Sequence, residues 1–316
     1  MTSKLNVYYN PSSLKHKGFP GFSERPARLK KLTNLFNELA LPVIQPQGAT
    51  PAQLQRAHDA AYIDHVKSIS EKGLIDATFA NWKSEQVQWY TRVSKGSYTA
   101  AVDAAGSICQ AVDDTLSGKC TRAFCAVRPP GHHAGPARGE GFCLFNNAAV
   151  GALHALQSGA KRVAVIDFDR HHGNGTQDII QKNGNGQVLF ISSYQEGCKY
   201  NQNAGAGRIA PDVLTVPIPQ HSDFKTVEDL YRKQVIPALH EFKPDLIILS
   251  AGFDMHKSDP LTNLKLESQD YGTLTKMLVD AANALCGGKV VSALEGGYEL
   301  KALESCVRSH LVALKN

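Results

Sequence analysis

The sequence predicts an α/β protein in which one parallel sheet is covered by helices on both faces. Short apolar runs alternate along the chain with segments of helical periodicity, the order that produces parallel strands joined by helices. Most of the runs are uninterrupted, as expected for strands buried on both faces. Polar residues follow four of them, which end at Val127, Asp167, Ser250 and Leu294. Because ligands bind beyond the carboxyl ends of parallel strands, we expect these four segments to converge on one site.

The individual elements follow from local patterns. Leu29, Leu32 and Leu35 recur at helical spacing, which predicts an amphipathic helix, and alanine-rich composition favours a buried helix at 97–112. In chain order we predict a strand at 5–9, a helix at 25–39, a strand at 43–45, a helix from Thr50, a helix at 60–66, the helix at 97–112, a strand at 123–127, a helix at 148–156, strands at 163–167, 187–193 and 213–218, a helix at 224–242, a strand at 246–250, a helix at 264–285, a strand at 290–294 and a helix at 303–314. Residues 71–93 lack periodicity and are predicted to form a surface segment.

Length and composition exclude several classes of protein. A chain of 316 residues with 42% hydrophobic content can bury a large core, and no linker divides it, so we expect residues 1–316 to form a single domain. The formal net charge of +5 is spread over short clusters, which does not support direct nucleic-acid binding. Seven cysteines without a CxxC pair, no signal peptide and no long apolar run predict a reduced, intracellular, cytoplasmic protein without a membrane partner.

The stretch from Val163 to Gln177 contains the densest group of possible ligands. If the chain stays extended, Asp167, Asp169 and His171 lie on one face, and both Asp and His can bind a divalent cation there. Arg170 would then face the other way. A strand end with solvated charges is the alternative, but three such side chains followed by His-His-Gly-Asn-Gly disfavour it.

Three further clusters follow predicted strands. His132 and His133 lie on a proline- and glycine-rich loop that cannot bury two rings without hydrogen-bond partners, although a single histidine there would more often be structural. Phe142 is either a core aromatic or a pocket wall. Asp254 follows the strand at 246–250, and Tyr298 follows the strand at 290–294. These residues are expected to share one site with the central stretch.

Five motifs occur in order along the chain. They are Pro-Pro-Gly-His-His-Ala at 129–134, Gly-Phe-Cys-Leu-Phe-Asn-Asn at 141–147, Asp-Phe-Asp-Arg-His-His-Gly-Asn-Gly-Thr-Gln at 167–177, Ala-Gly-Phe-Asp at 251–254 and Glu-Gly-Gly-Tyr at 295–298. Together they resemble the zinc-dependent histone deacetylase family. Because Asn174 stands where class I members carry Asp, the sequence is most similar to the class II type and its bacterial relatives, the histone deacetylase-like amidohydrolases and acetylpolyamine amidohydrolases. The resemblance implies the arginase/deacetylase α/β fold with an eight-stranded parallel sheet, and eight strands are predicted above.

The resemblance implies two kinds of metal site. Asp169, His171 and Asp254 would be the ligands of one catalytic zinc ion, with Asp167 beside them. A structural monovalent cation, potassium or sodium, would be bound by Asp167, Asp169, His171 and Ser192.

The resemblance also implies how the acetyl amide of N-acetyl-lysine would be hydrolysed by a metal-activated water. His133, oriented by Asn174, would act as general base and then as general acid. His132, paired with Asp167, would remain charged, and Tyr298 would donate a hydrogen bond to the developing oxyanion.

The implied substrate channel admits more than one substrate. Gly141 and Phe142 would form one wall that grips the aliphatic stem of an acetylated lysine, and Arg28 matches an arginine near the family's internal cavity. Leu261 matches the position filled by Leu in protein-lysine deacetylases and by Glu in the polyamine-preferring type. An acetylated polyamine or another small acetylated amine is the alternative substrate, and Glu196 could provide a carboxylate for it.

The sequence departs from the family pattern at several positions. Phe168 and Arg170 replace the usual Trp and Val, and both are expected to face away from the metal. Tyr194 stands where Ser-x-His is usual, and the segment 199–207 lacks the Tyr-Pro-Gly-Thr-Gly motif that normally supplies the opposite channel wall. The rim carboxylate would have to come from residues 76–85.

Two other functions are considered. A binuclear manganese hydrolase of the same fold would use Asp254 and His256 together, but the additional bridging carboxylates around Asp167 are not found. A catalytically inactive module that binds acetylated amines is disfavoured by the presence of Tyr298 and both histidines.

Overall fold

The computed structural model describes residues 5–18, 21–73, 91–198, 201 and 204–316, which contain one nine-stranded sheet. The strands are β1 (Leu5–Tyr8), β2 (Val43–Ile44), β3 (Arg122–Cys125), β4 (Val163–Asp167), β5 (Val188–Gln195), β6 (Gly207–Ala210), β7 (Val213–Ile218), β8 (Leu246–Ala251) and β9 (Val290–Leu294). Their order is β2-β1-β3-β9-β8-β4-β5-β7-β6, and every neighbouring pair except β6 with β7 is parallel. The predicted α/β fold class is confirmed.

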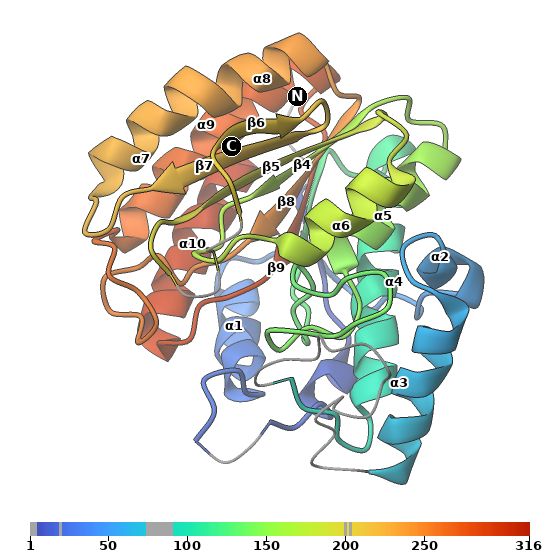
Figure 1. Cartoon of the computed structure of the whole chain (residues 1–316). Helices are drawn as coiled ribbons and strands as arrows, with labels where there is room; N and C mark the ends of the chain where they lie inside the picture. The colour runs from blue at the N-terminus through green and yellow to red at the C-terminus, as the bar shows by residue number, and fades with distance from the viewer. Residues whose placement is uncertain (1–4, 19–20, 74–90, 199–200, 202–203) are drawn as a thin grey trace.

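Helices cover both faces of this sheet (Figure 1). They are α1 (Ala27–Glu38), α2 (Pro51–Gln55), α3 (Ala60–Lys72), α4 (Ser97–Leu116), α5 (Asn147–Gln157), α6 (Asn174–Asn183), α7 (Phe224–Leu230), α8 (Ile236–Phe242), α9 (Ser268–Cys286) and α10 (Leu300–Lys315). On one face α10 packs against α1 and α9, and on the other face α5 packs against α4 and α6. As a result β8 contacts α5 on one side and α9 on the other.

The central strands consist of buried residues because they are covered from both sides. Every residue of β3, β4, β5, β8 and β9 is buried. Burying an aliphatic side chain fully contributes roughly 1.5–3 kcal/mol, so these runs are a main source of stability. They also confirm that uninterrupted apolar runs in this sequence mark central parallel strands.

The sheet differs from the predicted one in its number of strands. β6 is a ninth strand, antiparallel to β7, where the sequence predicts eight parallel strands and a loop. Gly205 and Gly207 have φ values of 74° and 80°, which glycine adopts without strain, and they precede the reversal onto β7. β6 lies at the edge, and none of its residues is buried. It therefore lacks the apolar run that would predict a strand.

Two helical regions also differ from the prediction. α6 begins at Asn174, where no helix is predicted. The predicted helix at 224–242 consists of α7, a π-helical turn at Tyr231–Val235, and α8. Pro237 lies in the first turn of α8, and because proline has no N–H and its ring displaces a carbonyl of the preceding turn, regular α-helical bonding cannot continue through it.

The order of the strands positions the candidate site. β3, β9, β8 and β4 are consecutive neighbours, so the four polar segments that follow them lie at one edge of the sheet. Of the predicted surface segment at 71–93, residues 74–90 lie outside the described residues.

Two further observations concern disulfide bonds and membrane-spanning helices. None of the seven cysteines forms a disulfide, and all are buried. In the described part of the chain, no helix combines the length and the apolar character that a bilayer crossing requires.

Candidate active site

Asp169, His171 and Asp254 form a cluster of possible metal ligands beyond the ends of β4 and β8. One ligand atom from each residue lies within 4.8 Å of the others, and all three residues are buried. Nδ1 of His171 lies 3.1 Å from Oδ1 of Asp169 and 3.3 Å from Oδ2 of Asp254. The buried Oδ2 of Asp254 has no hydrogen-bond partner among the described residues. Two carboxylates and one imidazole, with an oxygen that lacks a donor, fit a divalent metal such as zinc.

Glycine allows the backbone to approach this cluster closely. Gly296 donates its N–H to Oδ2 of Asp169 at 2.8 Å. A Cβ at this position would lie 2.5 Å from Oδ2 of Asp169 and 2.6 Å from Oδ2 of Asp254. A Cβ at Gly252 would also collide with the Asp169 carboxylate. Any larger residue at either glycine would displace a possible ligand.

The chain bends sharply after β4, and the bend is fixed by its own carboxylates. The N–H of Asp169 donates to Oδ1 of Asp167 at 3.0 Å, and the N–H of His171 donates to Oδ1 of Asp169 at 2.9 Å. Because the strand ends at Asp167, side chains no longer alternate beyond it. Phe168 still points into the core, against Phe253 and His310.

The expectation that Arg170 faces away from the site is wrong. Arg170 lines the same cavity as His171, and its Nη1 lies 2.9 Å from Nε2 of that histidine. The alternation argument fails here because it assumed an extended chain through a segment that bends.

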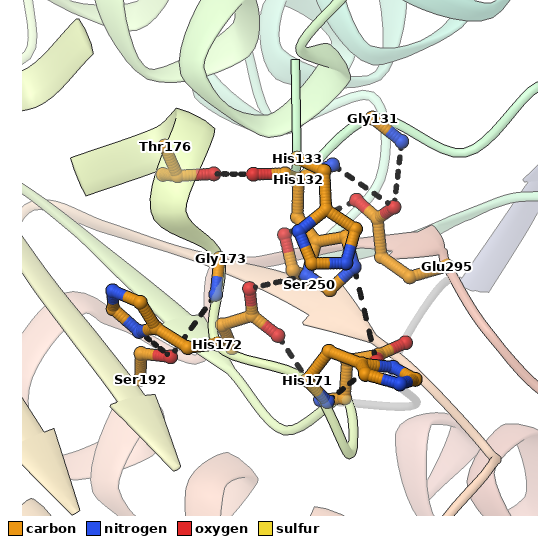
Figure 2. Close-up of polar contacts among 12 residues, drawn as sticks. Gly131, His132, His133, His171, His172, Gly173, Thr176, Ser192, Ser250 and Glu295 are labelled. Atoms are coloured by element: carbon orange, nitrogen blue, oxygen red, sulfur yellow. Dashed lines mark hydrogen bonds and ion pairs between the residues drawn. The ribbon is translucent and has the colours of Figure 1, made fainter. Parts of the chain in front are cut away.

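His132 and His133 lie side by side near this bend, with ring centroids 4.0 Å apart (Figure 2). Nδ1 of His132 lies 2.9 Å from Oδ2 of Asp167. Burial alone would lower the pKa of His132, but the carboxylates of Asp167 and Asp169 outweigh it and raise the pKa to about 10. His132 is therefore positively charged at neutral pH.

The environment of His133 has the opposite effect. Its Nδ1 lies 2.6 Å from Oδ1 of Asn174, which can only accept a hydrogen bond, so Nδ1 carries the proton and Nε2 is left with a lone pair. Burial and the neighbouring charge of His132 hold the pKa of His133 well below its ordinary value. His133 is thus a neutral imidazole that can accept a proton.

Glu295 fixes the loop that carries both histidines, a role that the sequence does not predict. Its Oε2 accepts the N–H groups of Gly131 at 2.7 Å and of His132 at 3.2 Å (Figure 2). Its Oε1 accepts the hydroxyl of Ser250 at 3.3 Å. Glu295 therefore connects the end of β8 with the segments after β3 and β9.

Tyr298 lies in an aromatic and cationic environment. Its ring centroid is 5.8 Å from that of Phe142 and 5.1 Å from the guanidinium carbon of Arg28. Burial, together with the carboxylates of Asp254 and Asp169, holds the pKa of Tyr298 well above its ordinary value. Its hydroxyl therefore stays protonated and can donate a hydrogen bond.

A cavity of about 360 Å³ opens beside these groups. It is lined by Gly21, Phe22, Ser23, His133, Glu140, Gly141, Phe142, Arg170, His171, Asn174, Leu261 and Tyr298. The ring of Phe142 makes edge contacts with two other rings, 6.2 Å from that of Phe22 and 5.8 Å from that of Tyr298. Gly141 has a φ of 53°, and a Cβ there would collide with the ring of His133.

Several residues singled out in the sequence lie elsewhere. Ser192 is buried beside β4, and its Oγ lies 2.9 Å from Nδ1 of His172 (Figure 2). Tyr194 donates its hydroxyl to the carbonyl of Gly205. Glu196 is exposed and is not among the residues that line the cavity. Residues 76–85, considered for the rim carboxylate, lie outside the described residues.

His256 does not join the metal-ligand cluster. Its Nδ1 accepts the N–H of Ser258 at 3.1 Å, and its Nε2 lies 3.2 Å from Oγ of Ser268. Among the described residues, the cluster that could hold a metal contains Asp169, His171 and Asp254 alone. A binuclear site would use His256 as a metal ligand, but both of its ring nitrogens contact Ser258 or Ser268 instead.

Comparison with known proteins identifies the family. Residues 22–314 match the model of the histone deacetylase domain. This chain belongs to the histone deacetylase family. It is 36% identical to type-2 histone deacetylase 2 of Dictyostelium discoideum over 98% of the chain, although it spans only 21% of that protein. It is 35% identical to the histone deacetylase-like amidohydrolase of Pseudomonas aeruginosa, over 90% of the chain and 75% of the relative.

A solved structure agrees with this assignment. The crystal structure of the HDA15 HD domain matches with a TM-score of 0.88 and 33% identity, covering 99% of this chain and 90% of that one. The arginase/deacetylase fold expected from the sequence motifs is therefore confirmed.

Proposed function

We propose that this protein is a zinc-dependent deacetylase that hydrolyses the acetyl amide of N-acetyl-lysine, with residues 1–316 forming one catalytic domain. The observation that carries the proposal is the position of His171, which belongs to the ligand cluster and also lines a cavity with His133 and Tyr298. A base, a hydrogen-bond donor and a metal site thus border one space. When bound, zinc would supply Lewis-acid polarisation of the acetyl carbonyl and of a water molecule.

The histidine pair provides proton transfer. His133 is neutral, with the lone pair of Nε2 available, so it can take a proton from the attacking water and return it to the leaving amine. His132 stays charged beside Asp167 and stabilises negative charge electrostatically. The two adjacent rings therefore have different roles because their partners differ, a carboxylate for one and an amide for the other.

Tyr298 provides the donor for the developing oxyanion. Its raised pKa keeps the hydroxyl protonated, and losing one such donor typically reduces the rate by ~10²–10³. Gly297, the residue before Tyr298, has a φ of 110°, a backbone conformation that residues with a side chain rarely adopt.

A structural potassium or sodium ion is also proposed, near Asp167, Asp169, His171 and Ser192. Its support is the pairing of Asp167 with Ser192 across β4 and β5, which brings a carboxylate and a hydroxyl together in the buried layer behind the site. Oxygen ligands of this kind suit hard cations.

The substrate class follows from the lining of the cavity. Phe142 and Leu261 supply apolar surface for a methylene stem, and Leu261 offers no carboxylate to a second ammonium group. An acetylpolyamine or another small acetylated amine is the second candidate, because the cavity accepts an aliphatic stem of either origin.

The deciding experiment compares an acetyl-lysine peptide with N-acetylputrescine on the zinc-loaded protein. We expect zinc-dependent release of acetate and a higher kcat/KM for the peptide. No acetate release from either substrate, at one bound zinc per chain, would reject the deacetylase proposal.

A further inference from the structure

Arg170 places a cationic side chain in the wall of the substrate cavity. The residue lies between two possible metal ligands in the sequence, is 8% exposed and lines the cavity together with His171 and Leu261. Its backbone N–H donates to Oδ1 of Asp254 at 2.9 Å, so the main chain is fixed by the ligand cluster itself. The side chain therefore starts from a rigid position.

The guanidinium group is also held at its other end. Nε of Arg170 donates to Oε1 of Gln195 at 3.1 Å. The same oxygen accepts the N–H of Asn263 at 3.0 Å and the hydroxyl of Thr262 at 3.3 Å. Gln195 thus connects Arg170 to the loop that carries Leu261, and both residues belong to one part of the cavity wall.

Within the described part of the chain, no side chain neutralises the charge of Arg170. No carboxylate lies within ion-pair distance of its guanidinium among the described residues, and its Nη2 makes no hydrogen bond to them. An unpaired buried cation is unfavourable unless a partner is supplied. Since Arg170 faces the cavity, the partner can come from a ligand there.

Among the described residues that line the cavity, the carboxylate that could pair with Arg170 already has other hydrogen-bond partners. Glu140 lines the same cavity, but its Oε2 accepts Nε of Arg138 at 3.3 Å and Nδ2 of Asn174 at 3.2 Å. Arg138 also pairs with Asp178 at 2.5 Å, so this cation is shared between two carboxylates. Glu140 is thus held by Arg138 and Asn174, whereas Arg170 has no carboxylate partner among the described residues.

We propose that Arg170 determines specificity by favouring acetylated amines that carry a carboxylate over those that carry a second ammonium group. The inference rests on the proposed deacetylase function and deepens it. Arg donates two parallel hydrogen bonds to a carboxylate, whereas it repels an ammonium group at the same place. Leu261 removes the attraction for polyamines, and Arg170 adds repulsion against them.

A matched series of small substrates tests this. N-acetyl-4-aminobutyrate is anionic, N-acetylputrescine is cationic and N-butylacetamide is neutral, and all three have similar stems. We expect the zinc-loaded wild type to show a kcat/KM at least tenfold higher for the anion than for the cation. In Arg170→Gln this ratio should fall at least fivefold, and Arg170→Lys should keep most of it.

The measured quantity is the ratio of kcat/KM for the anion to that for the cation within each variant. A change in the chemical step affects both substrates and cancels in this ratio. Arg232→Gln is the matched control, since Arg232 is an exposed arginine that pairs with Glu228 and does not line this cavity. It should leave the ratio unchanged. A wild-type preference for the cation, or an equal ratio in wild type and Arg170→Gln, would overturn the inference.

A binding measurement separates this inference from the proposed function. If the zinc-loaded wild type hydrolyses none of the three compounds and no acetyl-lysine peptide, the deacetylase proposal fails. Calorimetric titration with N-acetyl-4-aminobutyrate and N-acetylputrescine then decides the role of Arg170 without turnover. Tighter binding of the anion that is lost in Arg170→Gln supports the inference, and equal binding of both compounds to the wild type rejects it.

Discussion

Asp259 accepts the backbone N–H of Tyr298 at 2.6 Å through Oδ2, and the N–H of Leu261 at 3.1 Å through Oδ1. One carboxylate thus holds the loop after β8 and the loop after β9 at a fixed separation. Both loops contribute a residue to the cavity wall. Asp259 is therefore a positioning residue for the tyrosine, although it does not line the cavity itself.

Asp259→Ala is expected to lower kcat by about 10²-fold, because small displacements of a catalytic group cost about that much in rate. Metal content should stay at the wild-type level, since Asp259 is not in the ligand cluster. Asp259→Asn keeps one acceptor oxygen and should lower kcat less than Asp259→Ala does. Asp280→Asn is the control, because Asp280 is exposed and pairs with the exposed Lys276. An unchanged kcat in Asp259→Ala would show that the tyrosine loop is held by other contacts.

Removing a possible ligand should remove both metal and turnover. Asp169→Ala and Asp254→Ala each leave two ligands where a catalytic zinc site uses three protein ligands. We expect elemental analysis to find about one zinc per wild-type chain and little in either variant. Two tightly bound manganese ions per wild-type chain would contradict the mononuclear site.

Changing the proposed base or the proposed oxyanion donor should separate metal binding from catalysis. His133→Ala and Tyr298→Phe should retain zinc, because neither residue is part of the ligand cluster, but kcat should fall by ~10²–10³. The measurement is steady-state kinetics with metal analysis on the same preparations. Wild-type turnover by Tyr298→Phe would exclude the tyrosine as the donor.

Leu261→Glu should shift preference towards acetylated polyamines. The new carboxylate would line the cavity and attract a second ammonium group, an effect that can amount to several kcal/mol when the pair is desolvated. The ratio of kcat/KM for N-acetylspermidine to that for an acetyl-lysine peptide should rise relative to the wild type. Leu261→Gln, similar in size but neutral, is the control and should leave that ratio nearly unchanged.

His310 should make the fold sensitive to acid. It is buried between α9 and β9, with Nδ1 2.6 Å from Oγ1 of Thr275 and Nε2 2.9 Å from Oγ of Ser292. Burial lowers its pKa to about 3, so the folded state keeps it neutral while the unfolded state takes up a proton below pH ~6.5. The free energy of unfolding should therefore fall as pH drops from ~6.5 towards 3.

The measurement is urea unfolding of wild type and His310→Asn at several pH values. The stability advantage of the wild type should shrink by up to ~1.4 kcal/mol per pH unit over this range, because one proton binds only to the unfolded state. A constant difference between the two proteins from pH 7 to pH 4 would mean that His310 titrates normally in the fold.

The sequence was most informative where residues lie on regular strands or directly after them. The clusters at His132, Asp169, Asp254 and Tyr298 could be grouped because parallel strands end at one edge of a sheet. The argument failed at Arg170, where side-chain alternation was extended past the end of β4 into a bend.

Glu295 and Asp259 could not be assigned from the sequence for a different reason. Each accepts hydrogen bonds from backbone N–H groups. Any residue except proline supplies such a donor, so the sequence does not show which residue is the partner. The bond from Gly131 to Glu295 joins residues 164 positions apart. Only the order of strands in the sheet brings them together.

The central place of β9 constrains when the site can form during synthesis. This strand lies between β3 and β8, yet it is the last of the nine described strands in chain order. Until residues 290–294 emerge, β3 and β8 have no shared neighbour, and the nascent chain exposes two buried-type strand edges. The site can therefore assemble only after residues 290–294 are available to pair with both neighbouring strands.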